Sequence, residues 1–235
     1  MLKNVLKTFT DIVLPNLCFI CEEKITSGHL CKKCVEKIEF LFPPLCKLCS
    51  RPFLPNKKPI CSKCKTPNAL PYEQLICVTA YKEPIATLIH LFKYENYSYL
   101  SSTLSELMIK HLTRIGINLS DYDIITPVPM HRAKLRERGY NQSELLAEKI
   151  AKHFNISLRN DIISVKSIRS QQVKLNRRQR KENLKNLFEV NQDMKDKKII
   201  LIDDIFTTGQ TVKECAYALK NKGARITVLT LAKTQ

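Results

Sequence analysis

Beyond residue 73, short apolar runs alternate with longer segments whose apolar residues recur at helical spacing. The strand-like runs span residues 74–81, 122–130, 186–190, 197–203 and 225–232, and the helical segments span residues 83–95, 100–115, 142–154 and 209–223. Because the strand-like runs are nearly continuous in apolar residues, they are typical of strands buried on both faces. Strands and helices in alternation predict an α/β fold built on a parallel sheet.

The first part of the chain lacks these long elements. The proline-marked stretch KTPNALPYE, residues 65–73, separates it from the α/β pattern, and we place the boundary between residues 1–68 and residues 69–235. Apolar residues at positions 2, 5, 6, 9, 12 and 13 predict an N-terminal helix. We expect this helix to pack on the domain behind it, and a membrane-bound or partner-bound helix is the alternative.

Cysteines dominate the chemistry of this first part, because eight of the ten form four CxxC pairs. Two thiolates at this spacing can bind one zinc ion, and two such pairs complete a tetrahedral site of four sulfurs. Such a site leaves no open coordination position, so the zinc is structural rather than catalytic. The sequence therefore predicts up to two structural zinc ions, with the ligands Cys18, Cys21, Cys31, Cys34, Cys46, Cys49, Cys61 and Cys64.

The pairing of these cysteines is open from sequence alone. Turn-forming residues between Cys21 and Cys31, and between Cys49 and Cys61, favour two sequential zinc ribbons. In the alternative, a cross-braced arrangement, the first and third pairs share one ion. Disulfides are disfavoured because the N-terminus lacks a secretion signal, and we expect a soluble, cytoplasmic protein. With no apolar run of about 18 residues, we expect no stable membrane insertion.

The charge of the chain favours an anionic partner. The sequence holds 39 Lys and Arg against 22 Asp and Glu, for a formal net charge of +17. Nucleic acid and phosphorylated small molecules both fit this excess. Between residues 131 and 181, fourteen Lys and Arg stand against four Asp and Glu. That segment is a candidate anion-binding site, and a merely solvated basic surface is the alternative.

One motif carries a more specific chemistry. The stretch IILIDDIFTTGQT, residues 199–211, is an apolar strand that ends in Asp203 and Asp204 and opens onto a Thr- and Gly-containing loop before a helix. Successive strand side chains point to opposite sides, so one of the two acids can face a ligand. The free amides of a helix N-terminus favour an anion. A ribose 5-phosphate meets both demands, with hydroxyls for the carboxylates and a phosphate for the loop.

This motif resembles the phosphoribosyl-pyrophosphate motif of type I phosphoribosyltransferases. Further segments resemble the ComF (ComFC) competence family from about Leu14 to the end of the chain: the four CxxC pairs, HLFKYENYSYL, DIITPVPMHRAKLRERGYNQSELLA and RSQQVKLNRRQRKENLKNLF. The resemblance implies a type I phosphoribosyltransferase-like parallel sheet that follows a small N-terminal zinc-ribbon domain.

The resemblance also implies roles for particular residues. Asp203 and Asp204 match the family's ribose-contacting, catalytic acids. The loop Thr207, Thr208, Gly209, Gln210 and Thr211 matches its 5-phosphate loop. The turn from Pro129 through Arg132 matches the place where type I enzymes hold pyrophosphate, often with magnesium. The candidates for pyrophosphate contact are therefore Arg132, Arg136 and Arg138. Residues 166–181 match the flexible loop or hood, but without a pattern specific for a base.

Three functions are compatible with these features. The first is a phosphoribosyltransferase-like protein that binds phosphoribosyl pyrophosphate and serves DNA uptake in natural transformation, with single-stranded DNA or other competence proteins as partners. The second is a single-stranded DNA binding accessory whose sugar-phosphate site is vestigial or regulatory. The third is a purine-salvage phosphoribosyltransferase, which is disfavoured because salvage does not need a double zinc ribbon.

Overall fold

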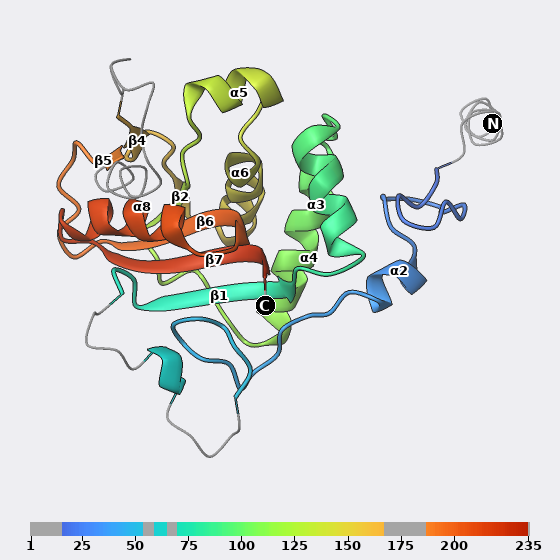
Figure 1. Ribbon diagram of the computed structural model, residues 1–235, viewed down its shortest axis with the longest axis horizontal. Coiled ribbons are helices and arrows are strands. Elements are labelled where there is room, and N and C mark those ends of the chain that lie inside the picture. The colour runs from blue at the N-terminus through green and yellow to red at the C-terminus, as the bar shows by residue number, and fades with distance from the viewer. Residues whose placement is uncertain (1–15, 54–58, 65–69, 167–186, 235) are drawn as a thin grey trace, which may run out of the picture.

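The computed structural model describes residues 16–53, 59–64, 70–166 and 187–234 (Figure 1). The predicted helix over residues 2–13 lies outside this part, as do all but the first residue of the basic segment 166–181. Among the described residues, no helix is both long enough and apolar enough to span a bilayer.

A five-stranded parallel sheet forms the centre of the molecule. Its strands lie in the order β1 (Gln74–Ala80), β7 (Arg225–Lys233), β6 (Lys198–Phe206), β2 (Ile124–Pro127) and β3 (Ser157–Leu158). Every pairing in this sheet is parallel. The predicted α/β fold with a parallel sheet is therefore confirmed.

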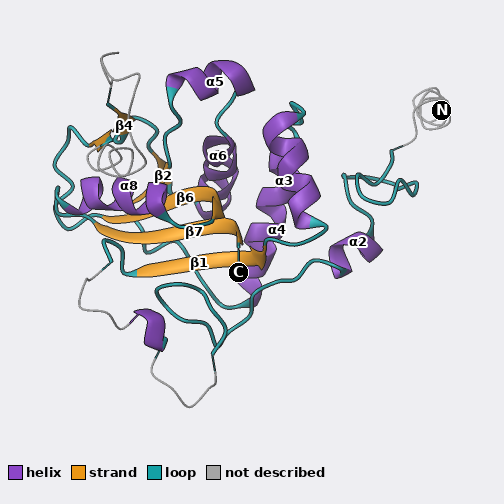
Figure 2. Ribbon diagram, viewed as in Figure 1, coloured by secondary structure: helices purple, strands orange, loops and turns teal. Residues whose placement is uncertain are grey.

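Helices cover both faces of this sheet, as the apolar runs required (Figure 2). On one face, α3 (Ile85–Tyr94), α4 (Leu100–Arg114) and α6 (Gln142–Phe154) pack against residues such as Ile200 and Ile202. On the other face, α8 (Gln210–Lys220) packs against the alternate residues Ile199 and Leu201. Each strand of the centre is thus apolar on both sides. Cys77 and Cys215, which stand outside the CxxC pairs, are buried in this core.

Short elements depart from the sequence prediction. The expected turn after β2 continues into a helix, α5 (Arg132–Arg138), which has no buried residue and therefore no apolar stripe to reveal it. The strand predicted at 186–190 is β5 (Phe188–Glu189), which pairs antiparallel with β4 (Ser164–Val165) outside the main sheet. Strand β6 extends past the acid pair to Phe206, because β7 continues to pair with it there.

The cysteine-rich segment runs along the free edge of β1. The helices among its described residues are α2 (Lys32–Glu36) and a short 3-10 helix at Ser62–Cys64. Between the two cysteine groups, the Leu41 N–H donates to the Val78 carbonyl, and the Ala80 N–H donates to the Glu39 carbonyl. A sheet edge left open would offer unpaired backbone groups to other chains. Here the segment between the cysteine groups pairs with that edge.

The second cysteine group continues this cover. The Leu75 N–H donates to the Lys47 carbonyl at 2.9 Å. The buried Ser50 hydroxyl donates to the Leu75 carbonyl at 2.6 Å and accepts from the Cys77 N–H at 3.1 Å. In the segment between the two cysteine groups, Ile38 is buried in the apolar core and Phe40 packs against it. The cysteine-rich segment is therefore tied to the α/β part by backbone pairing and by core packing.

Candidate functional site

The eight cysteines form two separate groups of four. Cys18, Cys21, Cys31 and Cys34 make one group, and Cys46, Cys49, Cys61 and Cys64 make the other, with the sulfur atoms of each group within 4.8 Å of one another. The pairing is sequential, as favoured from the spacing, and the cross-braced alternative is wrong. Four converging thiols without other ligands suit a closed tetrahedral zinc site. The prediction of two structural zinc sites is confirmed.

Backbone amides support the thiolates of both groups in the same way. The Cys31 N–H donates to Cys18 Sγ, and the Cys61 N–H donates to Cys46 Sγ, each at 3.3 Å. Burial by itself raises the pKa of Cys18, but backbone donors from Cys31, Cys21 and Ile20 outweigh it and lower the pKa to about 6. At Cys18 the knuckle therefore favours the deprotonated form that a zinc ion binds, whereas burial and the neighbouring thiols raise the pKa of Cys34.

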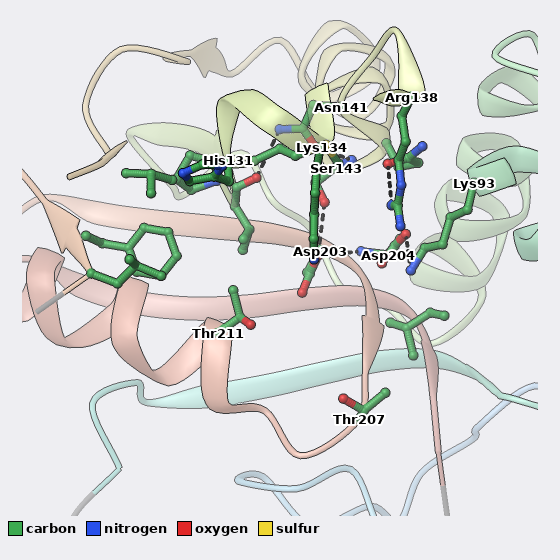
Figure 3. Close-up of a pocket in the computed structure, with 18 of the residues that line it drawn as sticks. Lys93, His131, Lys134, Arg138, Asn141, Ser143, Asp203, Asp204, Thr207 and Thr211 are labelled. Atoms are coloured by element: carbon green, nitrogen blue, oxygen red, sulfur yellow. Dashed lines mark hydrogen bonds and ion pairs between the residues drawn. The ribbon is translucent and has the colours of Figure 1, made fainter. Parts of the chain in front are cut away.

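A second site lies at the carboxyl ends of the parallel strands, where ligands bind in open α/β sheets. It is a cavity of about 500 Å³. Its walls come from the end of α3, the segment after β2, helix α5, the start of α6, the exit of β6 and the start of α8 (Figure 3). Segments that are far apart in the sequence therefore meet around one space.

Both acids of the motif line this cavity, although strand alternation suggested that only one would face a ligand. Asp203 Oδ1 accepts from the Ser143 hydroxyl at 3.0 Å. Asp204, on the other side of the strand, pairs with Lys93 Nζ at 2.8 Å. Ser143 of α6 and Lys93 of α3 therefore each hold one acid of the pair at the cavity.

The environment of the acid pair favours one proton on it. Burial, together with the neighbouring Asp204 carboxylate, raises the pKa of Asp203 from 3.8 to about 7. The Ser143 hydroxyl and the Lys93 ammonium act in the opposite direction. Two carboxylates this close resist a second negative charge unless cations or hydrogen-bond donors balance it. A ligand that brings hydroxyl donors would supply that balance.

The loop after β6 has the geometry of an anion cradle. Gly209 is the N-cap of α8 with φ +69°, and the Thr208 hydroxyl accepts from the Gln210 N–H at 3.4 Å. A Cβ on Gly209 would lie 2.2 Å from Cζ of Phe206, so the turn can be this tight only with glycine. Thr207 and Thr211 line the cavity, whereas the Gln210 side chain donates to Glu214 instead.

The cations of α5 divide between two faces of the helix. Of the three predicted arginines, Arg138 lines the cavity, where it also stacks over the Tyr94 ring at 4.9 Å. Arg132 and Arg136 are exposed and are not among the described lining residues. Lys134, four residues before Arg138 and so on the same face, takes part instead.

Sequence reasoning missed Lys93, Lys134 and Ser143, all of which line the cavity. Lys93 lies in a helix with an apolar stripe, and a lysine in such a helix is expected to be on the solvent-exposed face. Lys134 would have followed from its spacing to Arg138 had the helix been predicted. Ser143 stands at the start of the predicted helix 142–154, where a serine is typical of a helix cap.

Comparison with known proteins finds family matches for both parts of the chain. Residues 9–65 match the double zinc ribbon domain, and residues 141–235 match the phosphoribosyl transferase domain. DNA utilization protein YhgH of Escherichia coli (strain K12) is 31% identical, over 91% of this chain and 94% of that protein. Competence protein F of Haemophilus influenzae is 28% identical over 90% of this chain and 87% of its own length. Competence protein ComFC of Bacillus subtilis is 24% identical over 90% of this chain and 92% of its own length.

Solved structures to which the chain is similar include two phosphoribosyltransferases. The purine phosphoribosyltransferase of Pyrococcus horikoshii is 16% identical, with a TM-score of 0.35 over 58% of this chain and 84% of that one. The orotate phosphoribosyltransferase of Aeropyrum pernix is 18% identical, with a TM-score of 0.36 over 60% of this chain and 63% of that one.

The fold and the two sites define a phosphoribosyltransferase-like α/β protein that carries an N-terminal double zinc ribbon. Within that class, the chain belongs to the ComF (ComFC) family of competence proteins.

Proposed function

We propose that this protein binds phosphoribosyl pyrophosphate with magnesium in the cavity at the carboxyl end of its sheet. The observation that carries the proposal is the meeting of three features in one cavity: the acid pair Asp203 and Asp204, the glycine-capped N-terminus of α8, and the cations Lys134 and Arg138. The acids suit the ribose hydroxyls, the loop suits the 5-phosphate, and the cations suit the pyrophosphate.

Magnesium fits this site as a companion of the ligand. Among the described residues, the groups that could form a protein cage for a metal are the two cysteine groups, which suit zinc. Magnesium prefers oxygen ligands and is often held by one or two carboxylates together with substrate phosphates. Asp203 and Asp204 would be the protein's contribution, and the bound ion would neutralise charge on the pyrophosphate.

The reaction that suits this site is transfer of the phosphoribosyl group. The bond between the anomeric carbon and pyrophosphate breaks, an acceptor forms a bond to that carbon and loses a proton, and pyrophosphate leaves with the bonding electrons. The residues of the cavity orient the donor and balance the charge that develops on the sugar and on the leaving group. No side-chain nucleophile is required. The His131 imidazole also lines the cavity, but it is not needed as a nucleophile.

Calorimetric titration with phosphoribosyl pyrophosphate and magnesium tests the proposed ligand. The wild type is expected to bind, and the variant Asp203→Asn/Asp204→Asn is expected to lose at least about tenfold in affinity, because both hydroxyl acceptors are weakened. Glu106→Gln, which removes an exposed carboxylate of α4, is the matched control and should bind like the wild type. Equal binding by the double variant would show that the ligand sits elsewhere.

We further propose that the protein acts in DNA uptake during natural transformation, in the cytoplasm, where thiols stay reduced. The support is its relationship to proteins named for competence and for DNA utilization. Transformation frequency in cells without this protein, complemented with the wild type or with Asp203→Asn/Asp204→Asn, tests the role. Rescue by the double variant as full as by the wild type would separate DNA uptake from the sugar-phosphate site.

The charge of the chain supports a second candidate function, direct binding of single-stranded DNA. A net charge of +17 is the electrostatic footprint expected of a protein that contacts phosphates. Binding of an oligonucleotide should then weaken steeply as salt is raised, because counterions are released from the DNA. A flat salt dependence would exclude phosphate contact as the source of affinity.

A further inference from the structure

We propose that Lys93 is a ligand-binding residue of the cavity, which moves from Asp204 to a pyrophosphate oxygen when the ligand binds. We further infer that the segment Tyr140–Ser143 holds it in position to do so. This inference rests on the proposed function, and it adds a residue for which the phosphoribosyltransferase resemblance gave no role.

The first observation is the burial of Lys93. Its side chain is only 17% exposed and Asp204 is 9% exposed, with Nζ and Oδ2 at 2.8 Å. Taking an ammonium group out of water is costly unless a partner compensates it. Six other ion pairs among the described residues each have both side chains at least 37% exposed. The pair of Lys93 and Asp204 is the exception, and it lies inside the cavity.

The second observation is the way the end of α3 is fixed. The last carbonyls of a helix lack partners within that helix. Here the Phe92 carbonyl, next to Lys93, accepts from the Tyr140 hydroxyl at 2.6 Å and from Gln142 Nε2 at 3.2 Å. Gln142 is fully buried, at 1% exposure. Two donors from residues at the start of α6 therefore fix the backbone next to Lys93.

The same segment fixes two other walls of the cavity. Asn141 Nδ2 donates to the Val128 carbonyl after β2 at 3.0 Å, and Ser143 Oγ donates to Asp203 Oδ1 at 3.0 Å. The four consecutive residues 140–143 therefore hold the end of α3, the exit of β2 and an acid of the pair in one arrangement. To begin, helix α6 needs only an N-cap, and the Asn141 side chain provides it by accepting from the Ser143 N–H. The other bonds of this segment are not needed to cap the helix.

The third observation is the position of Lys93 within the cavity. Lys93, Asp204 and Arg138 lie together on one side, and Thr211 of the loop lies on the other (Figure 3). Tyr94, the neighbour of Lys93, carries the Arg138 guanidinium over its ring. A ligand whose 5-phosphate sits at the loop would therefore direct its pyrophosphate toward Lys93 and Arg138.

Charge balance explains why Lys93 would change partner. Without a ligand, its ammonium compensates Asp204. A ribose hydroxyl that donates to Asp204 weakens the need for that cation, while the arriving pyrophosphate adds negative charge close by. Because the lysine has a flexible four-carbon stem and rotatable donors, Nζ can reorient without movement of the backbone.

The test compares three ligands, each with magnesium: phosphoribosyl pyrophosphate, pyrophosphate and ribose 5-phosphate. Lys93→Gln is expected to weaken the two pyrophosphate-containing ligands at least about tenfold, the loss typical of a charge-assisted hydrogen bond. Its affinity for ribose 5-phosphate should stay within about threefold of the wild type. Lys110→Gln, which breaks the exposed Lys110–Glu106 pair of the adjacent helix α4, is the control and should change none of the three.

The positioning role is tested with Tyr140→Phe, which removes one hydroxyl that donates to the Phe92 carbonyl and keeps the ring. The variant should show the same split between ligands as Lys93→Gln, but smaller. A variant that only loosened the fold would lower its melting temperature and weaken all three ligands alike.

The outcomes separate this inference from the proposed function. Binding of phosphoribosyl pyrophosphate by the wild type, with unchanged affinity in Lys93→Gln, would overturn the role of Lys93 and keep the function. Equal losses for all three ligands would reduce Lys93 to a structural partner of Asp204. If the wild type bound neither pyrophosphate-containing ligand, both proposals would fall.

Discussion

Asp203 is the residue whose chemistry depends most on its surroundings. Its pKa lies near 7 because burial and Asp204 oppose its charge. An acid with a raised pKa in the folded state holds its proton more tightly there than in the unfolded chain. Its contribution to stability is therefore present at low pH and is lost as pH rises from about 4 through about 7.

Asp203→Asn should remove this pH dependence. The free energy of unfolding of the wild type, relative to the variant, is expected to fall as pH rises through that window, and urea unfolding at a series of pH values measures it. Affinity for phosphoribosyl pyrophosphate should instead rise over the same window in the wild type, because the carboxylate accepts hydroxyls better than the acid does. Parallel stability curves for the two proteins would contradict the raised pKa.

Gly209 allows a second prediction, with a matched control in the same chain. Gly209 and Gly116 have nearly the same positive φ, +69° and +70°, but only Gly209 has atoms within 4 Å of an added Cβ. Gly116→Ala should cost about 1–2 kcal/mol from backbone strain alone. Gly209→Ala should cost a further 1–3 kcal/mol or so from the clash with Phe206, and should weaken the phosphate loop.

Thermal unfolding and ligand titration of both variants measure these effects. Gly116→Ala is expected to leave ligand affinity unchanged, since Gly116 is not among the residues that line the cavity. Equal destabilisation by the two substitutions would show that the Phe206 ring can move away from the added methyl group at little cost in free energy.

At the scale of elements, the second zinc group and the edge of β1 are coupled. The amides of Leu75 and Cys77 are protected by groups that belong to this zinc module, the Lys47 carbonyl and the Ser50 hydroxyl. Loss of zinc from Cys46, Cys49, Cys61 and Cys64 should therefore release them.

Cys46→Ser is expected to speed hydrogen exchange at the amides of Leu75 and Cys77 by tenfold or more. Cys18→Ser, which damages the first zinc group, is the control and should leave these two amides close to wild type. Such exchange reports local opening, so it detects the coupling even where the whole protein stays folded. Similar exchange in both variants would mean that the edge is held by the α/β part alone.

The predictability of each element follows from how much of its pattern is apolar. The central strands and the helices α4, α6 and α8 could be predicted, because the side chains that they bury recur in the sequence at strand or helix spacing. Helix α5 could not, because it buries nothing. The pairing of Glu39 and Leu41 with β1 joins segments whose partners no local pattern identifies.

The candidate site divides in the same way. Asp203, Asp204 and the loop to Thr211 are contiguous, so a motif reveals them. Lys93 and Ser143 reach the cavity from other elements, and only the packed structure shows that they converge. Arg132 and Arg136 illustrate the opposite case, because these arginines of the basic segment are exposed and are not among the described lining residues.

At the scale of the whole molecule, the boundary at residues 68 and 69 divides the sequence more sharply than it divides the structure. The stretch 38–50 belongs to the zinc-binding part, yet it contributes Ile38 to the core and pairs with the outer strand. We therefore expect the fragment 69–235 to expose β1 and to self-associate.

Size-exclusion chromatography with light scattering tests this expectation. The fragment 38–235, which keeps the covering stretch and the second zinc group, should remain monomeric under conditions in which 69–235 forms larger species. A monomeric, folded 69–235 fragment would show that the boundary read from sequence is also a structural one.

The cover on β1 also bears on the order in which the protein is made. The sheet partner of β1 is β7, and paired residues such as Cys77 and Thr230 are 153 positions apart. A ribosome adds roughly 5–20 residues per second, so β1 emerges many seconds before its neighbour exists. The zinc-binding stretch is already complete by then. Zinc supply during translation would thus decide whether the newly made β1 is covered by the zinc-binding stretch or has its backbone groups exposed until β7 is made.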